Sequence, residues 1–274
     1  MNSSEIIRKP VVAGQFYPSS SQEIKRQIET FIDKNVSKHD VIACMLPHAG
    51  YMYSGRVAAQ TLAQIYVKDK IILLGPNHTG YGVAFSIMTQ GLWQTPIGEI
   101  KIDSSLAKQI LKSSKYLEQD SSAHMHEHSL EVELPILQYF RPNFEIVPIA
   151  FLSDDIERLK KIGIEIAGVI NNSGLKESCL LVASSDMTHY EPQEAAQRKD
   201  KIAIQAILEL DADKLAENIR RLDISMCGYA PAIVMIEAAK QLGAKTARLI
   251  KYQTSGDVTG DKDSVVGYAG IIVY

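Results

Sequence analysis

Three kinds of feature are scarce or absent in this sequence, and the first is paired cysteine. Only three cysteines, Cys44, Cys179 and Cys227, occur among 274 residues, and no two of them form a CxxC motif. An odd and sparse set argues against a disulfide framework and favours a reducing compartment. The N-terminal stretch also lacks the apolar segment of a signal peptide. We therefore expect a cytoplasmic protein.

Long apolar runs and a strong net charge are missing as well. No run approaches the roughly 18 apolar residues that a transmembrane helix needs. The formal net charge is −3 and the sequence pI is about 6.2, which does not suggest binding to nucleic acid or to an anionic membrane. We expect neither partner, and instead expect a small-molecule or peptide ligand.

What the sequence does contain is an alternation of strand-length apolar runs with helical patterns. This alternation predicts an α/β fold, in which a mostly parallel or mixed central sheet is covered by helices on both faces. No segment reads as a linker, so one domain is expected over residues 1–274. The predicted strands are 41–46, 70–74, 83–89, 145–151, 179–183, 246–252 and 265–273. The predicted helices are 21–35, 54–66, 104–112, 129–139, 154–172, 192–208, 211–221 and 231–242.

Local signals refine some of these elements. Ser153, followed by two acidic residues, is a plausible N-cap for the helix 154–172. Pro135 lies inside a helical pattern, so that helix should kink or begin a new segment there. Pro96 and Gly98 mark the bend of a short hairpin.

Histidines recur directly after predicted strands. His48 and His78 each follow one strand, and Asp186 and His189 follow another. Ligands of open α/β sheets bind at the carboxyl ends of the strands, where the connecting loops converge. A single histidine in such a place is usually a turn residue, but this recurrence favours a shared site. We expect these side chains to meet at one edge of the sheet.

A second group of histidines lies in the stretch "SAHMHEHSLEVELP". His124 and His128 are four residues apart, which is a chelating spacing on a helix. This group is either a second metal site or a solvated loop that leads into a helix. We favour the loop, with His124 and His126 exposed. His128 adjoins Ser129 and Glu131 at the start of an apolar helix and could point inward.

The cysteines fall into two classes. Cys44 and Cys179 lie in apolar strands, where cysteine usually behaves as a small core residue. Cys227 lies in a glycine-containing loop before a helix that has Pro231 in its first turn. A helix N-terminus lowers the pKa of a thiol, which suits a metal ligand or a nucleophile. A buried inert cysteine is the alternative.

Seven motifs follow one another along the chain: "GQFYP", "PHAGYMYSG", "LGPNH", "EHSLEVELP", "SSDMTHY", "MCGYAP" and "SVVGYAGIIVY". In this order they resemble the Memo family, which includes the mediator of ErbB2-driven cell motility and protein B of the AmmeMemoRadiSam system. The fold of that family is similar to the LigB-type class III extradiol dioxygenases, where two histidines and a glutamate hold Fe(II). In Memo proteins a cysteine takes the place of the glutamate.

The resemblance implies a metal site and the groups around it. The implied metal ligands are His48, His78 and Cys227, and the implied pocket groups are Asp186, His189 and His128. A ligand set of two histidines and a thiolate is softer than one with a carboxylate, so we expect iron or copper, with zinc possible. Cleavage of a catechol therefore does not transfer directly. Eukaryotic relatives are implicated in binding phosphotyrosine-containing receptor segments and in copper or iron handling.

Three functions follow from this set of residues. The first is a metal-dependent oxidoreductase, with His189, oriented by Asp186 or its neighbours, as general acid/base and His128 positioning substrate or O₂. The second is a zinc hydrolase that uses metal-bound hydroxide, with Asp186 or His189 as the base. The third is a binding module or metal carrier, in which Tyr51 and Tyr53 form an aromatic wall.

Overall fold

A mixed β-sheet forms the centre of the protein, which we describe from a computed structural model over residues 6–33 and 36–274. Its central strands are β2 (Ala43–Leu46), β3 (Lys70–Pro76), β8 (Glu145–Phe151) and β9 (Cys179–Ser184). They are parallel and lie in the order β8-β3-β9-β2. Every residue in them is buried except the first residues of β3 and β8. Such continuous apolar strands are typical of a parallel sheet that is covered on both faces.

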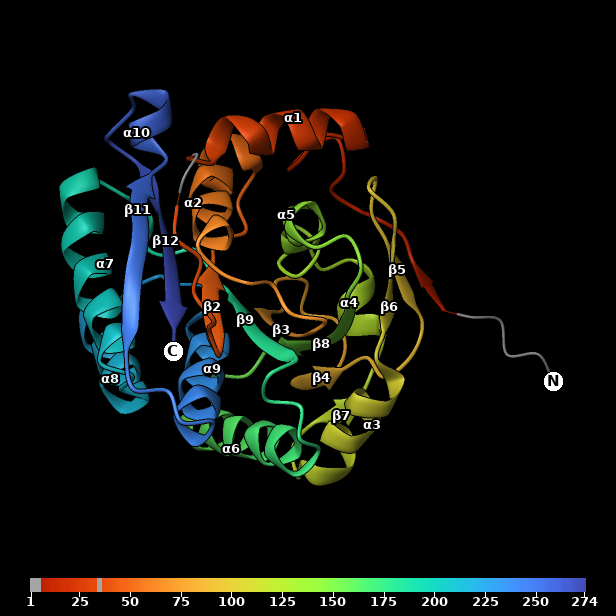
Figure 1. Ribbon diagram of the computed structural model, residues 1–274. Helices are drawn as coiled ribbons and strands as arrows, with labels where there is room; N and C mark the ends of the chain where they lie inside the picture. Colours follow the sequence, from red (N-terminus) through yellow and green to blue (C-terminus); the bar gives the residue numbers. More distant parts are fainter. Residues whose placement is uncertain (1–5, 34–35) are drawn as a thin grey trace.

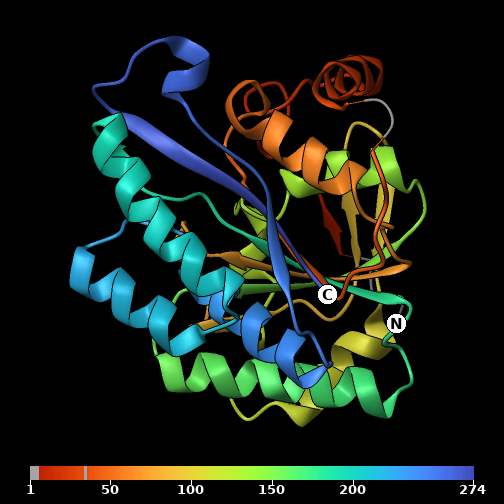
Figure 2. The same cartoon turned by 60° about the vertical axis from the view of Figure 1, so that its left-hand side comes forward.

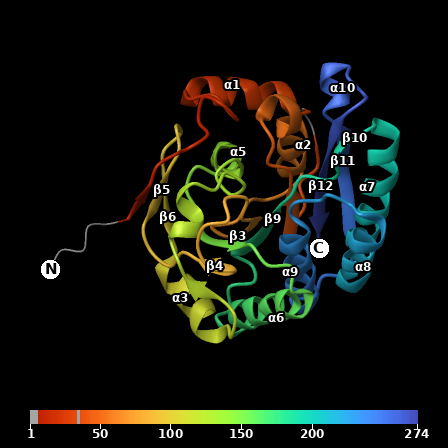
Figure 3. The same ribbon diagram turned by 180° about the vertical axis from the view of Figure 1, so that it is seen from behind.

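Further strands, in parallel and antiparallel pairs, extend the sheet at both edges (Figure 3). Beyond β2, the long strand β12 (Val265–Val273) runs antiparallel to β2 and pairs with β11 (Ala247–Thr254) and β10 (His189–Glu191). Beyond β8 lies the expected hairpin of β5 (Leu92–Gln94) and β6 (Glu99–Ile102), with Pro96 and Gly98 in its bend. The remaining short strands are β1 (Ile7–Arg8), β4 (Phe85–Ile87) and β7 (Glu118–Gln119).

Helices cover both faces of this sheet, as Figures 1 and 2 show, and the fold is the α/β class that the sequence predicts. One face carries α1 (Ser21–Phe31), α2 (Tyr51–Ala63) and α5 (Glu133–Phe140). The other carries α3 (Ser104–Ser113), α6 (Ile156–Asn172), α7 (Gln193–Leu208), α8 (Ala212–Leu222) and α9 (Tyr229–Gln241). Two single-turn helices, α4 (Ser122–Met125) and α10 (Gly256–Thr259), lie outside these layers. Among the described residues, no helix has the length and apolar character to cross a membrane.

Several predicted helix ends differ from the structure. Helix α2 begins three residues before its predicted start, because the carbonyl of Gly50 already accepts the N–H groups of Tyr53 and Ser54. Helix α6 is capped by Asp155, which accepts the N–H of Arg158, so the prediction of Ser153 as the cap is wrong. Helix α1 ends at Phe31, and the last two residues of the predicted helix 21–35 lie outside the described part of the chain.

Helix α5 begins later than the sequence predicts. Residues 129–132 form turns, and the N–H of Ser129 is taken by the side chain of Glu127. The helix starts at Glu133, so Pro135 lies in its first turn. Proline is tolerated there because its missing N–H would have no partner inside the helix. The chain therefore begins a new segment near Pro135 and does not kink at it.

Candidate metal centre

The carboxyl ends of three neighbouring strands bring the predicted site residues together. Strands β3, β9 and β2 are adjacent and parallel, so the loops after them leave from the same edge of the sheet. These loops carry His78, Asp186 and His48, respectively. The ring centroids of His48 and His78 are 5.3 Å apart.

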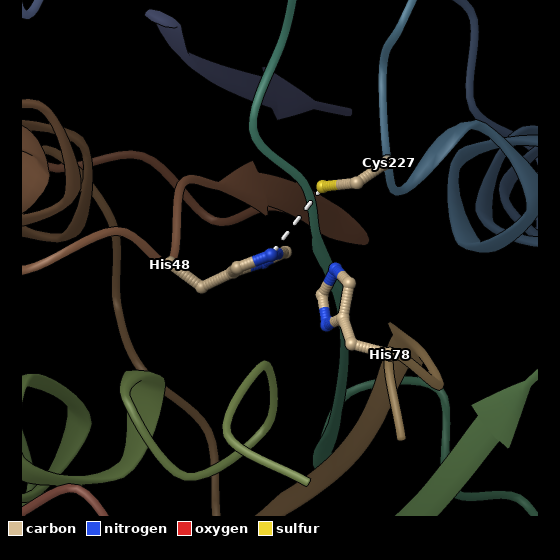
Figure 4. Close-up of side chains that lie close together, drawn as sticks. All are labelled: His48, His78 and Cys227. Atoms are coloured by element: carbon tan, nitrogen blue, oxygen red, sulfur yellow. Dashed lines mark hydrogen bonds between the residues drawn. The ribbon is translucent and has the colours of Figure 1, made fainter. Parts of the chain in front are cut away.

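Cys227 joins the two histidines from the loop before α9 (Figure 4). The possible ligand atoms of His48, His78 and Cys227 all lie within 4.8 Å of one another. Metal bonds of about 2.0–2.3 Å place tetrahedral ligand atoms roughly 3.3–3.8 Å apart, so small side-chain movements suffice. The two rings are inclined at 67°, which lets their lone pairs converge on one point. The three side chains form a group that could hold a metal ion.

Gly228 allows the loop of Cys227 to approach the end of β9. A Cβ atom at Gly228 would lie 2.4 Å from the carbonyl oxygen of Ser184, closer than such contacts occur in proteins. The N–H of Gly228 donates to Ser185 Oγ at 3.0 Å. Only glycine fits this close approach of two backbones. The thiol of Cys227 then lies 3.4 Å from His48 Nε2.

The electrostatics of Cys227 contradict the sequence-based expectation. Burial raises the pKa of the thiol, and the carboxyl group of Asp186 raises it further. The expected lowering of the pKa at a helix N-terminus is outweighed by the loss of water around the sulfur. In the metal-free protein Cys227 is a thiol, and a metal ion must displace its proton to bind.

Asp186 positions His48, whereas another residue positions His189. Asp186 Oδ1 accepts the backbone N–H of His48 at 2.9 Å. Burial raises the pKa of Asp186 to about 7, although the N–H groups of His48 and Ala49 lower it in part. Within the described residues, His189 is held by Ser225, through its backbone N–H to Oγ and its Nδ1 to the carbonyl oxygen, both at 2.8 Å. The hypothesis gave this role to Asp186 or its neighbours; Ser225 holds the ring, and the backbone of Met187, next to Asp186, also contributes a hydrogen bond.

His128 lies beside the two histidines of the candidate metal centre. Its ring centroid is 4.7 Å from that of His78 and 5.6 Å from that of His48. The ring of Phe16 meets its other side at 5.0 Å. Burial lowers the pKa of His128. The structure therefore places His128 at the site, between the metal-ligand candidates and the N-terminal segment.

Glu127 is a site residue that the sequence analysis missed. Its carboxylate is fully buried and accepts the backbone N–H groups of His78 and Ser129. The same group lies 3.0 Å from His78 Nδ1 and 3.3 Å from His128 Nδ1. Burial alone would raise the pKa of Glu127, but the hydrogen bond and charge of His78 lower it to about 2. An acidic residue between His126 and His128 was the signal in the sequence.

His78, Glu127 and His128 also lie close enough together to form a second candidate metal site. However, the rings of His78 and His128 are stacked at only 22° to each other. A histidine binds a metal ion in the plane of its ring, and two nearly parallel rings direct their lone pairs side by side. The oxygens of Glu127 are already occupied by N–H groups. This group is therefore better described as a carboxylate that orients two imidazoles.

His124 does not belong to the site, and its predicted exposure is wrong. The side chain is fully buried, and its Nε2 lies 3.0 Å from Ser86 Oγ. Burial lowers the pKa of His124 to about 4. Helix α4 ends at Met125, so His124 and His128 do not share a helical face. His126 is exposed, as expected.

A small cavity lies beside Phe16, whose ring also contacts His128. It has a volume of about 270 Å³, and its lining includes Phe16, Tyr17, Met52 and Tyr53. Tyr51 is a core residue instead, because it is buried and its hydroxyl donates to the carbonyl oxygen of Val132. Of the two tyrosines expected to form an aromatic wall, only Tyr53 lines this cavity.

Comparison with known proteins gives matches over nearly the whole chain. A family model described as "Memo-like protein" matches residues 8–272. The chain is 43% identical over 269 residues to a MEMO1 family protein of Methanococcoides burtonii, with 97% of this chain and 100% of that protein covered. A MEMO1 family protein of Methanocaldococcus jannaschii is 41% identical over 286 residues, with 97% and 99% covered. The crystal structure of uncharacterized protein JW3007 from Escherichia coli K12 shares the fold, with a TM-score of 0.56, 15% identity, and coverage of 83% of this chain and 98% of that one.

Proposed function

The chain belongs to the Memo family, and from that premise we propose that it holds one redox-active transition-metal ion on His48, His78 and Cys227. The observation that carries the proposal is the proximity of two imidazoles and one thiol, whose possible ligand atoms lie within 4.8 Å of one another. The ligands come from three separate loops at one edge of the sheet, which is where α/β proteins bind their ligands.

Iron or copper is the proposed metal. A site of two imidazoles and one thiolate is softer than a site of two imidazoles and one carboxylate. The softer site favours copper more strongly. When bound, iron or copper would supply one-electron redox chemistry, whereas zinc would supply only Lewis-acid chemistry.

His189 is the proposed general acid/base. Its Nδ1 donates to the carbonyl oxygen of Ser225, so its Nε2 carries the lone pair that would accept a proton from a ligand. Burial lowers the pKa of His189, which keeps the ring neutral and able to act as a base near pH 7. The ring is close enough to His48 to lower the pKa of that histidine.

The proposed substrate is a small molecule or a peptide segment that enters beside His128. Phe16 packs against His128, and Phe16 and Tyr53 also line the adjoining cavity. These aromatic side chains offer an apolar surface next to the polar groups of the site, a combination typical of ligand pockets.

The test is the metal content of untagged protein purified without oxygen, compared with that of Cys227→Ala. Cys179→Ala is the matched control, because Cys179 is also a buried thiol. It is the first residue of β9, whereas the candidate metal centre lies beyond the last residue of that strand. We expect near-stoichiometric iron or copper in the wild type and in the control, and its loss from Cys227→Ala. Absence of metal from the wild type, even after addition of Fe(II), Cu(I) and Zn(II), would contradict the proposal. Binding of zinc alone would favour the hydrolase.

A further inference from the structure

Each of the four histidines around the site has a partner at its Nδ1 atom. His48 Nδ1 lies 2.7 Å from Ser184 Oγ, and His189 Nδ1 lies 2.8 Å from the carbonyl oxygen of Ser225. The Nδ1 atoms of His78 and His128 lie 3.0 and 3.3 Å from the same oxygen of Glu127. A neutral imidazole carries its proton on one nitrogen only, so these partners decide which nitrogen remains a lone pair.

The direction of the hydrogen bond at His48 follows from the environment of Ser184. The hydroxyl of Ser184 lies 2.8 Å from the carbonyl oxygen of Ser129 and 2.8 Å from Oε1 of Glu133. Burial raises the pKa of Glu133 well above its ordinary value, so this carboxyl group can donate to Ser184 Oγ, whereas the carbonyl oxygen of Ser129 can only accept. The single proton of the serine hydroxyl is directed to Ser129, and none then remains for His48. His48 Nδ1 must therefore donate to Ser184 Oγ.

The direction at His78 follows from the environment of Glu127. Oε1 of Glu127 accepts the backbone N–H of Ser129 at 2.7 Å, and Oε2 accepts the backbone N–H of His78. Backbone N–H groups can only donate, so both oxygens act as acceptors here. His78 Nδ1 therefore donates to Oε1. The carboxylate of Glu127 therefore accepts both the backbone N–H and the ring Nδ1–H of His78. These two hydrogen bonds fix the ring in one orientation.

We propose that Glu127 and Ser184 are positioning residues that hold His78 and His48 as Nδ1–H tautomers, so that both Nε2 lone pairs are directed toward Cys227. This inference rests on the proposed metal-binding function for its purpose. In the metal-free protein His48 Nε2 is then an acceptor 3.4 Å from the thiol of Cys227. A metal ion would have to displace only the thiol proton, because neither imidazole has to change its tautomer.

The first measurement needs no variant. In metal-free, ¹⁵N-labelled wild-type protein at about pH 8, where imidazoles are neutral, two-bond ¹⁵N–¹H spectra distinguish protonated from bare ring nitrogens. Single His→Gln variants assign the signals. We expect protonated Nδ1 and bare Nε2 in His48 and His78. A protonated Nε2 in either of them would overturn the proposal.

The second measurement uses two variants with matched controls. In Glu127→Gln, the NH₂ of the new amide group would face N–H groups that the carboxylate of Glu127 accepts. In Ser184→Ala, the oxygen that accepts the proton of His48 Nδ1 is lost. We expect each to give a mixture of tautomers at its own histidine and roughly ten- to a hundred-fold weaker metal binding. The controls are Glu237→Gln, at a buried carboxylate in the second half of α9, and Ser86→Ala, at a buried hydroxyl beside His124.

The controls should change neither the tautomers of His48 and His78 nor the affinity for metal. Unchanged tautomers in both Glu127→Gln and Ser184→Ala would overturn the positioning role. The two proposals also fail separately. Predicted tautomers in a wild-type protein that binds no metal would support positioning and contradict the metal function. A wild-type protein that binds metal with protonated Nε2 atoms would contradict positioning alone.

Discussion

His48 Nε2 and Cys227 Sγ are 3.4 Å apart, although 179 residues separate them in the sequence. His48 follows β2 and Cys227 precedes α9, and the two segments meet over the end of β9. The parallel register of β2 and β9 fixes one side of this contact, and the close approach of Gly228 to Ser184 fixes the other. The metal-ligand geometry is therefore a consequence of sheet topology and of one glycine.

Replacement of Gly228 by alanine should weaken metal binding without unfolding the protein. The new Cβ atom would lie 2.4 Å from both the Ser184 carbonyl oxygen and Ser185 Cβ, so the loop must move and carry Cys227 away from His48. We expect a loss of metal affinity of at least tenfold, measured by titration of the metal-free protein. Gly168→Ala in α6 is the control. Its Cβ meets open space, and alanine should stabilise the helix by about 0.5–1 kcal/mol.

Substitution of Cys227 by serine should change which metal the protein prefers. Serine keeps the shape of the side chain but replaces a soft thiolate with a hard hydroxyl, and soft ligands select Cu(I). We expect the affinity for Cu(I) to fall at least tenfold more than the affinity for Zn(II), in competition with chelators of known affinity. Cys179→Ser, at the other end of β9, should alter neither. An equal loss for both metals would show that the sulfur does not determine selectivity.

Much of the fold could be predicted from the sequence, because apolar periodicity reports directly on strands and helices. The strands 145–151 and 265–273 match the structure at both ends. The position of His48 and His78 after parallel strands also follows from the pattern. Helix starts were less predictable, since they depend on which of several nearby groups accepts the first N–H groups. Ser129, for example, gives its N–H to Glu127 and so delays α5.

The chemistry of the site was harder to predict, because it depends on burial. The raised pKa of the Cys227 thiol comes from enclosure by residues that are remote in sequence, whereas the sequence shows only the nearby helix start. His124 is polar in a polar-looking stretch, yet it is fully buried against Ser86. Glu127 looks like a solvated acid until the backbone N–H of His78 is seen to donate to it.

Loss of the buried cation Arg8 should destabilise the protein strongly. Arg8 and Glu131 form an ion pair in which both side chains are fully buried, and Arg8 also donates to the carbonyl oxygens of His124 and Glu127. Removal of one partner leaves a buried charge uncompensated, which costs about 3–5 kcal/mol. We therefore expect Arg8→Met to lower the free energy of unfolding by this amount in urea titrations. A change below about 1 kcal/mol would mean that the N-terminal segment is held mainly by other contacts.

The stability contributed by Asp103 should depend on pH. Asp103 caps α3 through the N–H of Leu106 and pairs with Lys70. Burial alone would raise the pKa of Asp103, but these hydrogen bonds hold it below its ordinary value. Because the pKa is lowered in the folded state, the contribution is present above the ordinary pKa near 4 and is lost as the pH falls through the folded value. Asp103→Ala should therefore cost about 1 kcal/mol at pH 7, and the difference from wild type should shrink below about pH 4.

The variant Asp103→Asn separates the contribution of the negative charge to stability from the contribution of helix capping. Asparagine caps helices about as well as aspartate, but it has no proton to gain in this range and cannot pair electrostatically with Lys70. We expect Asp103→Asn to be less stable than wild type at pH 7 by the contribution of the charge alone, and to lose less stability than wild type on acidification. Urea titrations of the three proteins at several pH values measure both effects. If Asp103→Asn loses as much stability at low pH as the wild type, the titrating group that limits acid stability is not Asp103.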